Sequence, residues 1–126
     1  YGIRASHENT RASEMPAFGK DGILKQDQIS QVSNYVLSLS DAKHAATVEG
    51  KKLYAEHCAA CHGAEGKGDR TLGAPDLTDA IWLYGGTHTD IVAQINRPRH
   101  GVMPYWAGRL DDATIKQLAV YVHSLG

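Results

Sequence analysis

The spacing of apolar and polar residues predicts helices along this chain and no convincing strand. Near the C-terminal end, apolar residues recur on one face of a helix: Ile115, Leu118, Ala119, Val122 and Leu125. Asp111 precedes them as a good N-cap, and Gly126 follows them as a stop. We therefore expect a helix from about Asp111 to Leu125.

A second helix is expected from about Thr47 to Cys58. Gly50 lies inside it, although a glycine within a helix costs about 1 kcal/mol relative to alanine. Close approach by another helix would explain this cost, and Gly50 shares a face with Tyr54. We expect this face to meet Leu118 and Tyr121 of the C-terminal helix. Alternatively, Gly50 only marks a ragged helix start.

Shorter elements are expected between these two helices. Gly63–Gly73 is rich in glycine and polar residues, which is typical of a loop. Thr78–Tyr84 is expected to form a short helix that two glycines end. Thr87–Asp90 resembles a capping box, and the helix after it should end at Asn96 and Pro98. These elements together predict an all-α fold.

The only two cysteines of the chain lie in the motif Cys58-Ala59-Ala60-Cys61-His62. Two thiols at this spacing can each add to a vinyl group of a haem, and the adjacent imidazole can then reach the iron. The C-x-x-C-H pattern is therefore typical of c-type haem attachment. We predict one covalent haem c, with His62 as an axial ligand of its iron.

Three other uses of these residues are less well supported by the sequence. A structural zinc site normally has four Cys or His ligands, but the chain has no second cysteine pair and its histidines are scattered. A redox dithiol would usually lie near a βαβ pattern, and no strand run precedes Cys58. A disulfide across so short a loop would remove little entropy from the unfolded chain.

Composition narrows the function classes further. The 126 residues allow one domain, or one small domain with an appendage. The 13 basic and 14 acidic residues leave the chain near neutral, without the clustered basic charge of a nucleic-acid-binding protein. No apolar run approaches the ~20 residues that cross a bilayer, so we expect no membrane segment. A single Phe makes the apolar core thin, and a covalent haem would supply the missing apolar interior.

An internal repeat is the second strong signal. Leu24–Leu39 matches Leu110–Leu125 position by position. A Met-Pro pair precedes each copy, Met15-Pro16 in the first and Met103-Pro104 in the second. The combination of a Met-Pro pair with a matching helix indicates a true duplication rather than a coincidence of helix pattern.

The repeat predicts a division of the chain at about residue 44. Residues 1–44 look like the back half of a preceding haem domain, and residues 45–126 form a complete one, so we expect a fragment of a longer two-haem protein. A degenerate first module is the alternative. The helix at about 27–39 could compete for the face of Gly50 and Tyr54, and so promote a domain-swapped dimer. Otherwise it packs on the surface of its own module.

Met103 is the best candidate for the second axial ligand of the iron, because a methionine commonly completes the coordination of haem in cytochromes c. Pro104 favours extended backbone at Met103, which helps to aim the thioether inward from an irregular segment. His100 is the chief rival as a ligand. The other interpretation of Met103 is that it only fills the core.

Further residues could support the haem. We expect a backbone carbonyl near Pro75 to accept from the second ring nitrogen of His62 and so to fix its tautomer. Arg97 or Arg99 could pair with a haem propionate, or could equally be a solvated surface arginine. Trp82 could donate its indole N–H to a propionate or could simply pack in the core.

Residues 45–126 resemble a class I cytochrome c. Segments 73–78, 82–86, 99–104 and 118–126 resemble more narrowly the CcoP/FixP family, the dihaem cytochrome c subunit of cbb3-type oxidases. The resemblance implies a class I cytochrome c fold with an extra N-terminal helical segment. In that family the subunit also has an N-terminal transmembrane helix and a first C-x-x-C-H motif, and neither is found in this sequence.

The resemblance implies electron transfer by a chain that is not an enzyme on its own. In that family the subunit lies on the periplasmic side of the inner membrane. It receives electrons from soluble or membrane-bound cytochromes c and passes them toward the haem–copper subunit. Its partners would be these donors and the other oxidase subunits. Three alternatives stay open: a stand-alone periplasmic cytochrome c, a haem protein with a labile Met103 that binds gas or peroxide, and a non-haem binding module.

Overall fold

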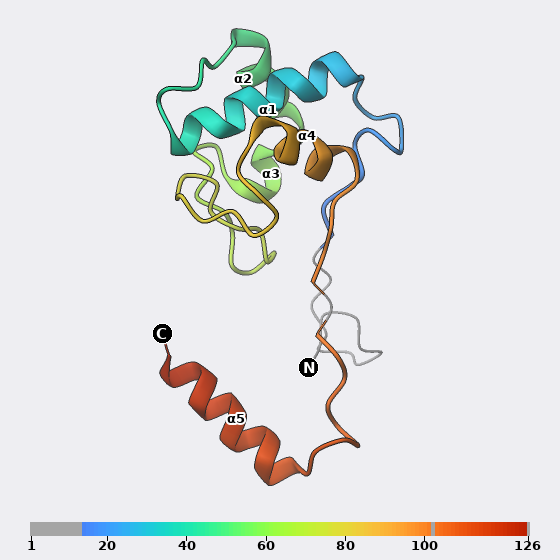
Figure 1. Cartoon of the computed structure of the whole chain (residues 1–126), viewed down its shortest axis with the longest axis vertical. Helices are drawn as coiled ribbons and strands as arrows, with labels where there is room; N and C mark the ends of the chain where they lie inside the picture. Colours follow the sequence, from blue (N-terminus) through green and yellow to red (C-terminus); the bar gives the residue numbers. More distant parts are fainter. Residues whose placement is uncertain (1–13, 102, 126) are drawn as a thin grey trace. The chain divides into compact units, whose positions relative to one another are not determined.

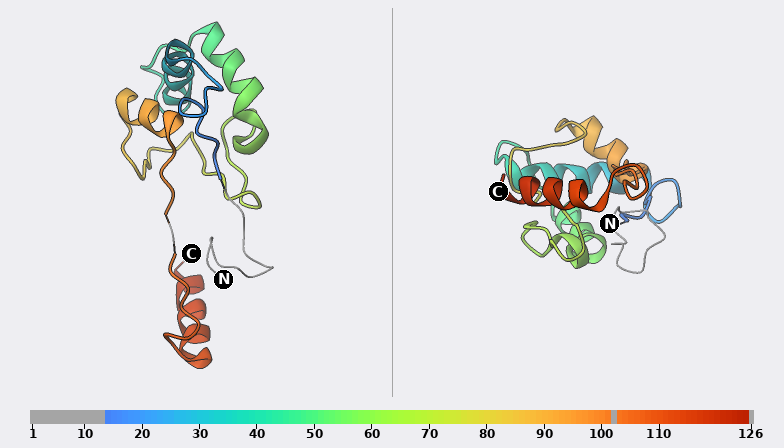
Figure 2. Two further views of the ribbon diagram at one scale, coloured as in Figure 1. Left: turned by 90° about the vertical axis from the view of Figure 1, so that its right-hand side faces the viewer. Right: turned by 90° about the horizontal axis from the view of Figure 1, so that it is seen from below.

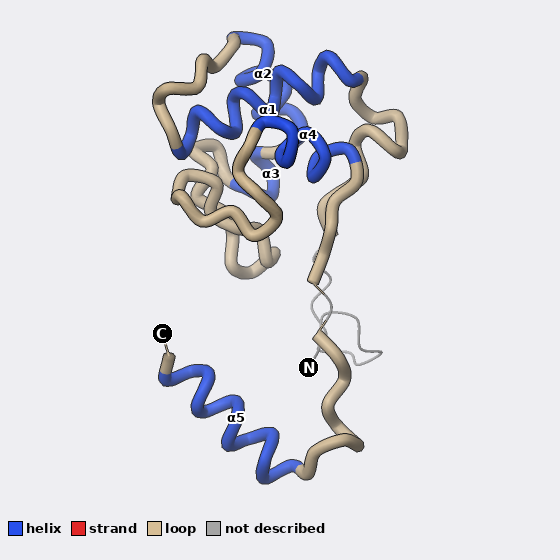
Figure 3. The backbone as a smooth tube through the Cα atoms, viewed as in Figure 1, coloured by secondary structure: helices blue, strands red, loops and turns tan. Residues whose placement is uncertain are grey.

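The structure is a computed structural model that describes residues 14–101 and 103–125, and every regular element in these ranges is a helix (Figures 1 and 3). The chain divides into two compact units. One unit is residues 12–101, and the other consists of residues 1–11 and 102–126. Each is described by itself. None of the helices in the described ranges has the length and apolarity needed to cross a membrane.

Helix α1 (Gln26–Ser40) forms the centre of the unit of residues 12–101. It contacts both α2 (Val48–His57) and α4 (His88–Asn96), and Figures 1 and 2 show it between them. Its apolar stripe is fully buried: Ile29, Val32, Val36 and Leu37 are all 5% exposed or less. The core of this unit therefore depends on the first copy of the repeat.

Gly50 lies where α1 and α2 come closest. A Cβ atom at this position would overlap the backbone carbonyl oxygen of Gln31 on α1. One turn further along α2, the Tyr54 ring packs against the Tyr35 ring with centroids 5.1 Å apart. A close helix crossing therefore explains the glycine, as the sequence predicted. The helix that crosses here is α1, whereas Leu118 and Tyr121 of the C-terminal helix were expected on this face.

The N-termini of α2 and α4 begin where their capping residues predict. The Thr47 hydroxyl accepts from the backbone N–H of Gly50 at 2.9 Å. Thr87 and Asp90 form a reciprocal capping box at the start of α4. The hydrogen bonds of Asp90 with Thr87 lower the pKa of its carboxyl group below the ordinary value. These short polar contacts satisfy N–H groups that have no partner inside the helix.

The helix expected over Thr78–Tyr84 is absent, and this prediction was wrong. The segment consists of bends and turns. The Asp76 carboxylate accepts from the backbone N–H of Thr78 at 2.7 Å, and the Asp79 carboxylate accepts from that of Ile81 at 2.9 Å. Aspartate side chains that take local N–H groups in this way favour turns over helix. The segment over Gly63–Gly73, by contrast, is the loop that was expected.

The second unit contains helix α5 (Asp112–Ser124), which confirms the expected C-terminal helix. The Asp111 side chain caps it by accepting from the backbone N–H of Thr114 at 2.9 Å. No residue of α5 is buried. Leu118 is 48% exposed and Tyr121 is 62% exposed. The expected stop at Gly126 lies outside the described residues.

Candidate functional site

The junction between α2 and the short helix α3 (Ala59–His62) holds the two thiols and the adjacent imidazole. Cys58 ends α2 and starts α3, and its backbone carbonyl accepts from the N–H of His62 at 2.9 Å. Both cysteines are free thiols; Cys58 is buried and Cys61 is exposed. One continuous helical segment thus fixes the positions of Cys58, Cys61 and His62 relative to one another.

A hydrogen bond to Pro75 fixes the orientation of the His62 ring. The distance from His62 Nδ1 to the Pro75 carbonyl oxygen is 3.2 Å. A carbonyl can only accept, so Nδ1 carries the proton and Nε2 is left with its lone pair for a metal. Burial lowers the pKa of His62, which also favours the neutral imidazole that metals bind. From the sequence we expected a backbone carbonyl near Pro75 to be the acceptor, and in the structure the contact is with the carbonyl of Pro75.

The loop after α3 brings Pro75 back to His62. The N–H of Gly68 donates to the His62 carbonyl at 2.8 Å, and Asp69 and Ala74 pair their backbones at 3.0 and 2.9 Å. Gly68 has a φ of 76°, and a Cβ there would come within 2.7 Å of the Pro75 carbonyl oxygen. Only glycine fits both the left-handed backbone and this close approach. The loop is therefore shaped to hold the acceptor of the His62 ring.

Tyr54 links α2 to the residue that follows α3 through a hydrogen bond. Its hydroxyl donates to the Gly63 carbonyl at 2.8 Å. Burial, with smaller effects from Cys58 and Tyr35, raises the pKa of Tyr54 to about 12, so the hydroxyl keeps its proton. Burial also raises the pKa of Cys58 to about 11, and the neighbouring Cys61 adds to this shift. At neutral pH the protein thus holds Cys58 as a thiol.

Three further residues were predicted to support the haem: Trp82, Arg97 and Arg99. Trp82 is half-buried and packs against the core. The Arg99 guanidinium donates to the Tyr84 carbonyl at 3.2 Å and lies 5.0 Å from the centre of that ring. Arg97 is exposed. The structure therefore gives Arg99 a protein partner.

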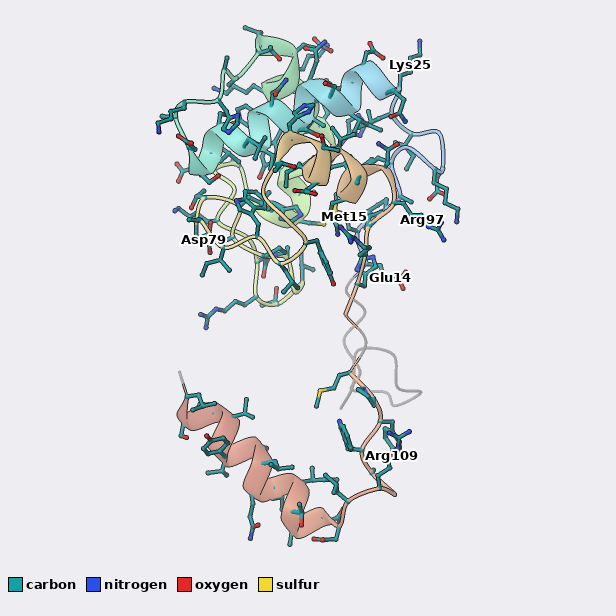
Figure 4. The ribbon with its side chains drawn as sticks, in the orientation of Figure 1. Glu14, Met15, Lys25, Asp79, Arg97 and Arg109 are labelled. Carbon is teal, nitrogen blue, oxygen red and sulfur yellow. The ribbon has the colours of Figure 1, made fainter. Side chains whose placement is uncertain are left out.

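The two methionines differ in their surroundings. Met103 belongs to the second unit and is 59% exposed. Met15 is half-buried and packs against the core of residues 12–101, and Figure 4 shows it beneath α4.

The residues at this junction fit a covalently held haem. The two free thiols supply the attachment points, and the oriented imidazole supplies a nitrogen ligand. The loop that follows exposes large apolar side chains suited to a flat apolar ligand: Leu72, Ile81 and Leu83. Within residues 14–101 and 103–125, no group of three or more His, Cys, Asp or Glu side chains could hold a metal ion.

Comparisons with known proteins agree with this chemistry. The family model for cytochrome C oxidase, cbb3-type, subunit III matches residues 45–122. The chain is 52% identical over its whole length to cbb3-type cytochrome c oxidase subunit FixP of Bradyrhizobium diazoefficiens, and it covers 44% of that relative. It is 51% identical to subunit CcoP of Cereibacter sphaeroides and 48% identical to subunit FixP of Rhizobium meliloti, again over its whole length and 44% of each relative.

The chain therefore spans less than half of the length of these curated relatives. The match over residues 45–122 includes the helical junction that holds Cys58, Cys61 and His62. It also includes the loop that brings Pro75 to the imidazole. These findings together show that the chain belongs to the cbb3-type cytochrome c oxidase subunit III family, a family of cytochrome c subunits of these oxidases.

Proposed function

We propose that this chain transfers single electrons through one c-type haem held by thioether bonds to Cys58 and Cys61. His62 is one axial ligand of the iron and Met103 is the other. The hydrogen bond from His62 Nδ1 to the Pro75 carbonyl, at 3.2 Å, is the observation that carries this proposal. It leaves Nε2 as the coordinating atom in a fixed direction, which is the arrangement that metal-ligating histidines require.

When bound, the haem supplies an iron that alternates between two charge states. Two strong ligands, His62 and Met103, would hold the iron and leave no position open for a substrate. The neutral carbonyl of Pro75 orients His62 without titrating, so the ligand geometry is preserved when the iron changes charge. Trp82, and also Arg99 where it is not engaged with Tyr84, are proposed to contact the haem edge.

The role proposed for the whole subunit follows from the relatives. The chain would accept electrons from soluble or membrane-bound cytochromes c and pass them to the haem–copper subunit of a cbb3-type oxidase, on the periplasmic side of the inner membrane. It would not be an enzyme by itself. Electron transfer of this kind uses brief, weak encounters in which charge complementarity sets the association rate.

We also propose that the division at residue 44 reflects ancestry. Residues 1–44 would derive from a preceding haem domain and residues 45–126 from a second one, each ending with a Met-Pro pair and a helix. Two copies of the chain could exchange these helices to form a dimer. Light scattering over a range of concentrations tests this dimer, and a monomer at every concentration would exclude it.

Haem attachment is tested by intact mass and a pyridine haemochrome assay on protein matured with haem-attachment machinery. The expected mass is the chain plus one haem, and the variant Cys58→Ser with Cys61→Ser should have the mass of the bare chain. A bare-chain mass for the unaltered protein would contradict the proposal. The Met103 assignment predicts that Met103→Ala lowers the reduction potential and lets the ferrous protein bind CO.

A further inference from the structure

Tyr54 lies on the face of α2 that α1 covers, and it contacts both ends of the segment that carries the two thiols and the imidazole. Its backbone carbonyl accepts from the N–H of Cys58, where this segment starts, at 2.8 Å. Its hydroxyl donates to the carbonyl of Gly63, the residue after His62, at 2.8 Å. Tyr54 is only 1% exposed, so the close packing around its ring keeps the hydroxyl in one direction.

The carbonyl of Gly63 connects Tyr54 to the loop that contains Pro75. A carbonyl oxygen has two lone pairs, and this one also accepts from the N–H of Gly66 at 3.1 Å. The carbonyl of Gly66 in turn accepts from the N–H of Leu77 at 2.7 Å, and Leu77 lies two residues beyond Pro75. A continuous run of hydrogen bonds therefore leads from the Tyr54 hydroxyl to the segment that supplies the acceptor of the imidazole.

The hydrogen bond between the His62 ring and the Pro75 carbonyl, at 3.2 Å, requires that both partners stay in place. On the side of the imidazole, the N–H of Gly68 holds the carbonyl of His62 at 2.8 Å, and Tyr54 holds the next carbonyl along the chain. On the side of the acceptor, the hydrogen bond of Leu77 holds the segment of Pro75. The other bonds that hold the two partners join backbone groups, so Tyr54 supplies the side chain that anchors this arrangement to α2.

We propose that Tyr54 is a positioning residue for the axial ligand: its hydroxyl keeps the His62 ring bonded to the Pro75 carbonyl and so sets the orientation of the imidazole on the iron. This inference rests on the proposed haem site and deepens it by giving a role to a side chain of α2. A hydrogen bond at the second ring nitrogen makes an imidazole a stronger donor to its metal. Stronger donation favours the ferric form, so Tyr54 keeps the reduction potential of the haem low.

The test compares Tyr54→Phe with the unaltered chain, both loaded with haem. This variant removes only the hydroxyl and keeps the ring. Exchange of the His62 Nδ1 proton with deuterated water, followed by NMR in the diamagnetic ferrous protein, measures whether the contact with Pro75 is kept. We expect the exchange to become about fivefold faster, the factor that corresponds to one hydrogen bond of ordinary strength.

The reduction potential gives a second measurement that a general loosening of the fold would move the other way. We expect it to rise in Tyr54→Phe, because the imidazole becomes a weaker donor. Entry of water near the haem would instead lower it, since water favours the more highly charged ferric form. A lower potential in Tyr54→Phe would therefore overturn the proposal.

Two further variants serve as controls. Tyr35→Phe removes a hydroxyl from the neighbouring ring, which packs on Tyr54 with centroids 5.1 Å apart, and it should leave both measurements unchanged. Gly68→Ala displaces the acceptor itself, because a Cβ there would come within 2.7 Å of the Pro75 carbonyl oxygen, and it should change the exchange in the same direction as Tyr54→Phe. The Soret absorbance shows that each variant carries its haem.

The other outcomes are also decisive. Unchanged values in Tyr54→Phe, beside faster exchange in Gly68→Ala, would overturn the role of Tyr54 and leave the proposed haem site intact. Equal changes in Tyr54→Phe and Tyr35→Phe would overturn it too, because the effect would then come from the packing of the two rings. A Tyr54→Phe chain without haem, when Tyr35→Phe retains it, would contradict a role in orientation, since the hydroxyl would then be needed for attachment. An unaltered chain without haem would contradict the proposed function as well.

Discussion

Helices α1 and α5 have the same pattern of side chains but opposite surroundings. Ile29 and Val32 of α1 are completely buried, whereas no residue of α5 is buried. The matching residues are Ile115 and Leu118. A periodic apolar pattern therefore predicts a helix and its apolar face. It does not predict which surface of the protein that face will cover.

Two positions of α1 that are buried or partly buried have a different kind of side chain in α5. Leu37 is 2% exposed, and the matching residue of α5 is His123. Burying a leucine stabilises a fold by about 1.5–3 kcal/mol, whereas a buried imidazole needs a hydrogen-bond partner. The Ser30 hydroxyl lies 3.4 Å from His88 Nε2 on α4, and α5 has Lys116 at the matching position. A lysine has no hydroxyl to make this contact.

The largest expected effect is a difference in stability between alanine substitutions at one matched position of the two helices. Ile29→Ala should lower the free energy of unfolding by about 3 kcal/mol, because it leaves a cavity between α1 and its neighbours. Ile115→Ala should change it by less than about 1 kcal/mol, since Ile115 is only half-buried. Urea unfolding of both variants measures the difference. Equal losses would contradict the difference in burial between α1 and α5.

Leu37→His places in α1 the residue that α5 has at the matching position, His123. We expect a loss of about 2.5 kcal/mol, from the apolar burial removed and the polar ring left inside. The reverse substitution, His123→Leu, is the control and should not reduce stability. Thermal unfolding followed by circular dichroism compares the two. A Leu37→His protein as stable as the unaltered chain would show that burial of Leu37 does not stabilise this unit.

Gly50→Ala tests the close approach of α1 to α2. The added methyl group would overlap the Gln31 carbonyl, so we expect a loss of about 2 kcal/mol as the helices move apart. Gly101→Ala is the matched control, because a Cβ there meets nothing within 4 Å. Chemical denaturation measures both. If alanine were tolerated equally at the two positions, the contact between α1 and α2 would be disproved.

The smallest expected effect is a difference in pH dependence between the helix starts. Hydrogen bonds from Thr114 lower the pKa of Asp111, the N-cap of α5, so its stabilising effect is present above the unfolded pKa and is lost as the pH falls through the folded pKa. At the start of α1, the neutral Gln28 amide accepts from the N–H of Lys25 instead. Acid should therefore fray the start of α5, as measured by amide chemical shifts, and Asp111→Asn should remove this dependence.

The local features of the fold could be predicted from sequence because they depend on neighbouring residues. Thr47, Thr87 and Asp111 start their helices through contacts three residues away. The spacing of Cys58, Cys61 and His62 fixes the relative positions of the two thiols and the imidazole in the same local way. The prediction of a helix over Thr78–Tyr84 was wrong because the carboxylates of Asp76 and Asp79 accept hydrogen bonds from backbone N–H groups, which favours turns. The spacing of apolar residues contains no information about these hydrogen bonds.

The partner of the α2 face could not be predicted, because two segments with equivalent patterns were available. Gly50 predicted that another helix would cross α2 closely. From the sequence, the approaching backbone could be that of Gln31 or that of Gln117. The two copies differ at single positions such as Leu37, which is buried and is matched by His123, and such differences have no periodic signature. The assignments of Met103, Trp82 and Arg99 to the haem stay predictions.

The account depends most directly on α1, rather than α5, covering the α2 face. Nuclear Overhauser contacts of the Tyr54 ring in the diamagnetic ferrous protein measure this. With ring centroids 5.1 Å apart, we expect strong cross-peaks between Tyr54 and Tyr35. Cross-peaks from Tyr54 to Tyr121 with none to Tyr35 would contradict the account.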